Sequence, residues 1–82
     1  MTKPAIKFSY GAKHTFDSLD RNLQRKILIR SQNLPLLVQL KQVQIIDTVY
    51  PPYRYRHTSK YFTLEFGLDS HQIPILLNII LR

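Results

Sequence analysis

In the last thirty residues of the chain, side chains of one kind recur at every second position, as they do in the strands of a β-sheet. Arg54 and Arg56 are separated by one residue, and after a polar turn at 58–59 the same spacing recurs in an apolar set formed by Phe62, Leu64 and Phe66. Because successive side chains of a strand point to opposite faces, each set lies on one face. A second turn at 68–72 leads into a nearly continuous apolar run over 73–81, which is typical of a strand covered on both faces. We therefore predict a meander of three antiparallel strands, and we expect Arg54, Arg56 and the terminal Arg82 to converge on one face of the sheet.

The first half of the chain predicts a strand followed by helix. Residues 5–10 alternate after Pro4 and are interrupted by Gly11. From residue 12 onward the apolar spacing becomes 4, 3, 4 and 4, which places one stripe along a helix. The residues of this stripe are Ala12, Phe16, Leu19, Leu23 and Ile27. Asp20 is a favoured N-cap, so this region forms either one helix or two, and Pro35 ends it.

Residues 36–49 are expected to form an extended connection, with a strand from about 40 to 49. Pro51 and Pro52 follow it, so strand pairing breaks there or the segment lies at an edge of the sheet. The predicted fold class is α+β: an N-terminal strand, one or two helices and a C-terminal antiparallel meander, with the helices packed on one face of an antiparallel sheet. The predicted core joins the helix stripe to alternate strand positions: Ile6, Phe8, Phe16, Leu19, Leu23, Ile27, Phe62, Leu64, Phe66, Ile75, Leu77 and Ile79.

The composition limits the possible classes of function. Eighty-two residues suffice for a single domain, 1–82. Twelve Lys and Arg against five Asp and Glu give a net charge of +7, which favours a polyanionic or acidic partner over incidental basicity. The chain has no cysteine, and no stretch approaches the roughly 20 apolar residues of a membrane span. Since the N-terminus also lacks a signal-peptide pattern, we expect a cytoplasmic protein without a membrane partner.

Metal and cofactor sites are not expected. The histidines His14, His57 and His71 lie far apart and have no Cys partners, which does not match the spacing of metal ligands. Two glycines in the whole chain are too few for a glycine-rich phosphate loop. We therefore expect neither a metal nor a small-molecule cofactor.

With its elements in this order, the sequence resembles the RelE/ParE toxin family of bacterial type II toxin–antitoxin systems, over about residues 5–82. In the first half, 16–20 and 23–28 match the family's helix pair. In the second half, 53–56 and 61–66 match its hairpin, and the final apolar strand ends in an arginine, as the family's does. The resemblance implies a single toxin domain that cleaves mRNA in the ribosomal A site and is neutralised by a cognate antitoxin.

The resemblance also implies candidate site residues. RelE-type members use Lys and Arg, sometimes Tyr, and the positions that this sequence offers are Lys41, Arg54, Arg56 and Arg82. Guanidinium groups suit the stabilisation of a pentavalent phosphorane because they keep their charge and present a planar fork of donors. The candidate catalytic residues are Arg54, Arg56, Arg82 and Tyr61. For the general acid or base, His57, Tyr55 and Lys60 are alternatives to Tyr61. The candidate RNA-binding residues are Lys41, Tyr53, Tyr55, His57 and Lys60.

Structural explanations of the same residues stay open at this point. Alternate basic residues also protect an edge strand from aggregation, and tyrosines on neighbouring strands often pack against each other. Leu28 and Ile29 lie outside the helix stripe, and 36–49 carries more apolar residues than a solvated connection needs. In the resembling family an antitoxin segment wraps such a surface, so Leu28 and Ile29 are the candidate antitoxin-binding residues.

Departures from the family pattern keep two further functions open. The usual Gly-Asp turn is Thr58-Ser59, the Arg of the next strand falls on Tyr61 or Phe62, and the His before the last Arg is Leu81. Members usually continue into a segment that often supplies a further catalytic Tyr or His, whereas this sequence ends at residue 82. The first expectation is therefore a metal-independent, ribosome-dependent mRNA endoribonuclease. The alternatives are a ParE-like inhibitor of DNA gyrase and a non-toxic member that only binds a partner.

Overall fold

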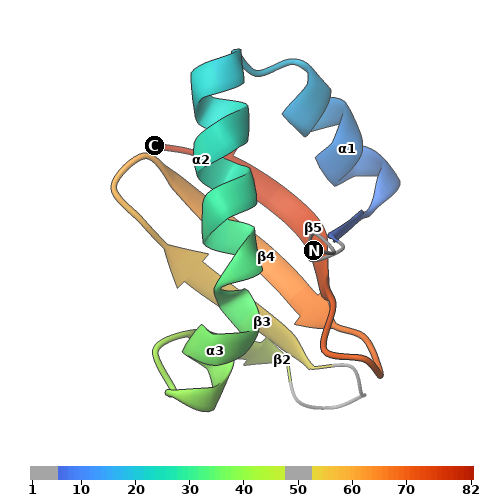
Figure 1. The fold of residues 1–82 in the computed structure, drawn as a ribbon, viewed down its shortest axis with the longest axis vertical. Coiled ribbons are helices and arrows are strands. Elements are labelled where there is room, and N and C mark those ends of the chain that lie inside the picture. Colours follow the sequence, from blue (N-terminus) through green and yellow to red (C-terminus); the bar gives the residue numbers. More distant parts are fainter. Residues whose placement is uncertain (1–5, 48–52) are drawn as a thin grey trace, which may run out of the picture.

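The computed structural model describes residues 6–47 and 53–82, which form an α+β domain with a five-stranded mixed sheet and three helices. The elements in chain order are β1 (Lys7–Phe8), α1 (Tyr10–Asp17), α2 (Arg21–Gln32), α3 (Leu34–Gln39), β2 (Gln44–Asp47), β3 (Arg54–Thr58), β4 (Phe62–Leu68) and β5 (Pro74–Leu81). Helices α1 and α2 lie across one face of the sheet, and α3 lies at the end where β2 begins (Figure 1).

The strand order in the sheet is β1-β5-β4-β3-β2. Strands β2 to β5 pair antiparallel with their neighbours, so the predicted meander is confirmed and β2 extends it. The prediction of a purely antiparallel sheet is wrong at one edge, because β1 runs parallel to β5, with Lys7 opposite Ile75 and Phe8 opposite Leu76. A strand separated from its partner by intervening helices can enter the sheet in the parallel sense.

The first two helices begin where a polar side chain caps them. The Ser9 hydroxyl accepts a hydrogen bond from the backbone N–H of Ala12, and the Asp20 carboxylate accepts one from that of Leu23 at 2.8 Å. The predicted boundary at Asp20 is therefore confirmed, and the region forms two helices. The predicted strand over 5–10 is too long, because the cap at Ser9 turns the chain into α1 and leaves Tyr10 93% exposed.

The third helix corrects the extended connection predicted from residue 36. Pro35 lies in the first turn of α3, where its missing N–H costs no hydrogen bond. The same proline that ends α2 therefore also starts α3. Lys41, with φ of 58°, then turns the chain toward β2. Strand β2, Gln44–Asp47, confirms the middle of the strand predicted from about 40 to 49. Residues 48 and 49, together with Pro51 and Pro52, lie outside the described residues.

The core lies between the sheet and the helices. Its buried apolar residues are Ala12, Phe16, Ile27, Leu34, Phe62, Leu64, Phe66, Leu76 and Ile79. Most predicted core positions of the helices and of β4 are confirmed, with Ile6, Phe8 and Leu19 half-buried at its margin. Leu23 is also half-buried, so the stripe on α2 turns partly toward solvent.

The prediction that Ile75 and Leu77 are core residues is wrong, because β5 contains a bulge. Glu65 pairs with Asn78, but the next residue, Phe66, pairs with Leu76, so Leu77 has no direct partner on β4. An extra residue in one strand inverts the alternation of its side chains. Leu76 is consequently buried with Ile79, although three positions separate them.

Candidate functional site

Arg54 and Arg56 lie on the face of the sheet that points away from α1 and α2. The two neighbouring positions of β3 face the helices: Tyr55 pairs with Phe66 of β4 and His57 pairs with Leu64. Both Phe66 and Leu64 are buried beneath the helices. Because side chains alternate along β3, the two arginines lie on the opposite face. The predicted shared face of Arg54 and Arg56 is confirmed.

The charge of Arg56 is balanced by a carboxylate directly across the strand pair. Its Nε and one terminal nitrogen donate to Glu65 Oε2 at 3.2 and 2.8 Å, and Asn78 Nδ2 donates to Oε1 at 2.9 Å. These hydrogen bonds from Arg56 and Asn78 lower the pKa of Glu65, and the positive charge of Arg54 adds to the effect. Glu65 therefore stays ionised, and Arg56 offers less charge to a phosphate than an isolated arginine does.

Arg82 lies at the other end of the β4 ladder from Arg54. Its backbone N–H donates to Tyr61 O at 3.1 Å and its guanidinium donates to Ser59 O at 3.0 Å. Arg54 precedes Tyr55, which pairs with Phe66 of β4, so Arg54 lies near Phe66 in the sheet. Tyr61 and Phe66 are five positions apart, which corresponds to about 17 Å of extended strand. The three arginines of the predicted catalytic set therefore do not converge on one point.

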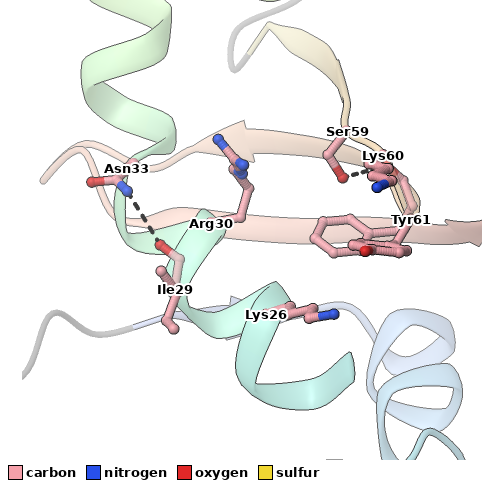
Figure 2. A pocket seen from close by; sticks show the side chains of 8 residues that line it. Lys26, Ile29, Arg30, Asn33, Ser59, Lys60 and Tyr61 are labelled. Carbon is pink, nitrogen blue, oxygen red and sulfur yellow. Dashed lines mark hydrogen bonds between the residues drawn. The ribbon is translucent and has the colours of Figure 1, made fainter. Parts of the chain in front are cut away.

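A pocket of about 310 Å³ opens beside Arg82, between the C-terminal half of α2 and the β3–β4 turn. Figure 2 shows Lys26 and Arg30 projecting from the helix on one side, with Lys60 and Tyr61 of the turn on the other. The remaining lining residues are Ile29, Asn33, Ser59 and Phe62. This pocket brings three basic side chains and a tyrosine together, and none of its lining residues is acidic.

Two lysines of the pocket contact the ring of Tyr61. The ammonium group of Lys26 lies 4.0 Å from the ring centroid of Tyr61, and that of Lys60 lies at 5.5 Å. Such cation–π contacts contribute roughly 0.5–1 kcal/mol each at exposed sites. Tyr61 nevertheless stays 45% exposed, so part of its ring is available to a ligand.

The other predicted RNA-binding residues are spread over the domain. Lys60 lines the pocket, whereas Tyr53 and Lys41 are exposed outside it, the first before β3 and the second in the turn before β2. Tyr55 packs toward the core, with its ring centroid 5.4 Å from that of Phe66. The packing explanation therefore holds for Tyr55.

His57 points inward and its Nε2 is buried without a hydrogen-bond partner in the described part of the chain. Burial lowers the pKa of His57, and the nearby positive charge of Arg30 lowers it further. The side chain is neutral at physiological pH, so it does not supply a positive charge to RNA.

The two candidate antitoxin-binding residues have different environments. Leu28 is half-buried and packs against the core, whereas Ile29 is 56% exposed at the margin of the pocket. Leu36, Leu40 and Ile45 are also exposed, on α3 and β2 and between them. The apolar surface available to a partner therefore includes Ile29 and this second group more than Leu28.

The helical residues of the pocket were missed by sequence reasoning. Lys26 and Arg30 are four positions apart and Asn33 follows three positions later, a spacing that places all of them on one side of α2. That signal was present in the sequence. Its meaning depends on the packing of α2 against the β3–β4 turn, which the spacing does not reveal.

Comparisons with family models, with curated protein sequences and with solved structures give no match. In 6–47 and 53–82, the histidines and acidic side chains form no group of three that could hold a metal ion. Within the same ranges, none of the helices combines the length and the apolar character needed to cross a membrane. The candidate site therefore rests on the chain's own geometry.

Proposed function

We propose that this chain is the toxin of a bacterial type II toxin–antitoxin pair and that it acts as a RelE-type, ribosome-dependent mRNA endoribonuclease. The observation that carries the proposal is the pocket that Lys26, Arg30, Lys60 and Tyr61 line together. The Arg82 guanidinium binds Ser59 O of the same β3–β4 turn. Two features of the chain agree with it: the net charge of +7, and the order of a first strand, helices and an antiparallel meander.

The reaction requires no metal. The 2′-hydroxyl of a nucleotide loses its proton and attacks the adjacent phosphorus, and the 5′-oxygen of the next nucleotide leaves with a proton. The products are a 2′,3′-cyclic phosphate and a 5′-hydroxyl. Arg82 and Lys60 supply positive charge to the phosphorane, and each positioned donor of this kind contributes a few kcal/mol. Tyr61 follows Lys60 in the chain and accepts the backbone hydrogen bond of Arg82, and it is the candidate proton carrier.

The proposed partners follow from the same surface. A ribosome presents mRNA and rRNA phosphates to the basic turn, and an acidic antitoxin would neutralise the same charges. The exposed Ile29, Leu36, Leu40 and Ile45 offer apolar contacts to such an antitoxin. The proposed location is the cytoplasm, where both of these partners occur.

Induced expression in a bacterial host tests the proposal, with mRNA 5′-end mapping and plasmid supercoiling followed in the same culture. We expect growth arrest, in-frame cuts in translated mRNA and unchanged supercoiling. Arg82→Gln should reduce cutting at least tenfold, because it removes a charge at the turn. Arg21→Gln, at the exposed start of α2, is the matched control and should cut like the parent protein. Absence of cuts at normal protein levels would refute the nuclease function.

A second function is favoured by the pairing of Arg56 with Glu65, which balances one of the arginines expected for catalysis. A gyrase inhibitor of the ParE kind needs a binding surface and no phosphorane stabilisation. Loss of supercoiling without mRNA cuts would support that function. Neither effect would indicate a non-toxic protein that only binds a partner.

A further inference from the structure

The basic pocket between α2 and the β3–β4 turn has features that a surface cluster of lysines lacks. Its volume of about 310 Å³ lies at the lower end of the range for small-molecule sites, roughly 300–1,000 Å³. Its two walls come from segments far apart in sequence (Figure 2), and the exposed Ile29 adds apolar surface to the polar groups. A ligand in this pocket would contact both walls at once.

The charge of the pocket is not cancelled from within the described structure. The ion pairs of 6–47 and 53–82 join Lys7 to Asp69, Lys13 to Asp17 and Arg56 to Glu65. None of them involves Lys26, Arg30 or Lys60, which bring three full positive charges to the pocket. The C-terminal end of α2 opposes an anion with only about half a negative charge. The basic side chains therefore dominate the local field.

The turn that forms one wall is held rigidly. The Ser59 backbone N–H and its hydroxyl both donate to Phe62 O at 2.9 Å, and the Arg82 guanidinium donates to Ser59 O at 3.0 Å. Lys60 and Tyr61 lie between these anchored residues. A wall fixed in advance loses little conformational freedom when a ligand binds.

We propose that this pocket binds a phosphate group of a nucleotide, with the ribose or base against Tyr61. Lys26, Arg30 and Lys60 donate to the phosphate oxygens as charge-assisted hydrogen bonds. The exposed part of the Tyr61 ring offers a surface for stacking. This inference rests on the proposed RNA function and names the group of the RNA that the pocket binds, a phosphate. It also makes α2 part of the RNA-binding surface.

Titration of the purified protein, followed by amide chemical shifts in ¹⁵N NMR spectra, tests the proposal. The probes are adenosine 5′-monophosphate, the phosphodiester dinucleotide ApA, inorganic phosphate and adenosine. We expect saturable shifts at Asn33, Lys60 and Tyr61 with the first two probes, weaker shifts with phosphate and none with adenosine. Tighter binding of the monophosphate identifies a terminal phosphate as the ligand, and tighter binding of ApA identifies the RNA backbone.

Matched variants separate the pocket from general basicity. Lys26→Gln and Arg30→Gln should each weaken binding about tenfold or more, the loss expected for one charge-assisted hydrogen bond. Arg25→Gln removes the same charge from an exposed position of the same helix outside the pocket lining and should change the affinity less than twofold. A thermal melt of each variant checks that it is folded.

Three outcomes would overturn the proposal: no saturable shifts with any probe, binding of adenosine as tight as that of its monophosphate, or equal losses in Arg25→Gln and Lys26→Gln. The outcome is independent of the cellular experiment. Nucleotide binding without mRNA cuts would support the nucleotide-binding pocket and refute the nuclease function. Cuts without nucleotide binding would support the nuclease function and refute the nucleotide-binding pocket.

Discussion

Truncation of Leu76 and of Leu77 to alanine tests the bulge in β5. The two residues are identical and adjacent, but Leu76 is fully buried (0% exposed) and Leu77 is half-buried on the other face. Leu76→Ala deletes buried methyl groups and leaves a cavity, which costs about 3–4 kcal/mol. Leu77→Ala removes a half-buried side chain and leaves no enclosed cavity, so the cost is about 1 kcal/mol.

These differences are large for so small a domain. A chain of 82 residues has a free energy of unfolding of roughly 4–12 kcal/mol. Leu76→Ala therefore removes about a quarter or more of the stability and lowers the melting temperature by roughly 12–30 °C, against roughly 4–8 °C for Leu77→Ala. Urea and thermal unfolding followed by circular dichroism measure both. Equal losses, or a larger loss for Leu77→Ala, would refute the register that places Leu76 in the core.

Further predictions concern a buried histidine, a helix cap and an ion pair. Because the pKa of His57 is lowered, the unfolded chain binds the proton more readily, so stability should fall as pH drops below about 6.5; in His57→Gln, urea midpoints at pH 5 and pH 8 should differ less than in the parent. Asp20→Ala should cost about 1 kcal/mol in the same assay and Asp20→Asn much less, since asparagine also caps a helix; equal costs would exclude the cap. Glu65→Gln frees the charge of Arg56 and should tighten binding to single-stranded RNA at low salt, an increase that fades as salt rises; unchanged affinity would show that the sheet face does not contact RNA.

The sequence predicts this fold best where one physical signal acts alone. Alternation over Phe62–Phe66 fixed the inward face of β4, and Asp20 marked the boundary between two helices. In β5 the single polar residue, Asn78, lies on the C-terminal side of the bulge, whereas Ile75, Leu76 and Leu77 are all apolar. No polar position before Asn78 therefore marks the inverted alternation. Pro35 is equally compatible with the end of one helix and the start of the next, and the prediction took only the first meaning.

The candidate site was predictable only in part. Tyr61, Lys60 and Arg82 belong to the hairpin and the final strand, which the sequence indicated clearly. The neutralisation of Arg56 was not visible, because it depends on the register that sets Glu65 opposite it. The contribution of α2 depends on tertiary packing, and local spacing cannot supply that information.

The parallel pairing of β1 with β5 affects how the chain folds during its synthesis. Lys7 pairs with Ile75, so β1, which is synthesised first, can pair with β5 only after nearly the whole domain has been translated. Contacts between residues so far apart in sequence close slowly, because the intervening chain must lose its freedom first. Strand β5 also pairs with β4 along the segment that leads to Arg82 and the β3–β4 turn. A nascent chain that lacks β5 therefore has neither its finished sheet nor the Arg82 contact to Ser59 O, and the turn that walls the basic pocket gains this last anchor only once the final strand is in place.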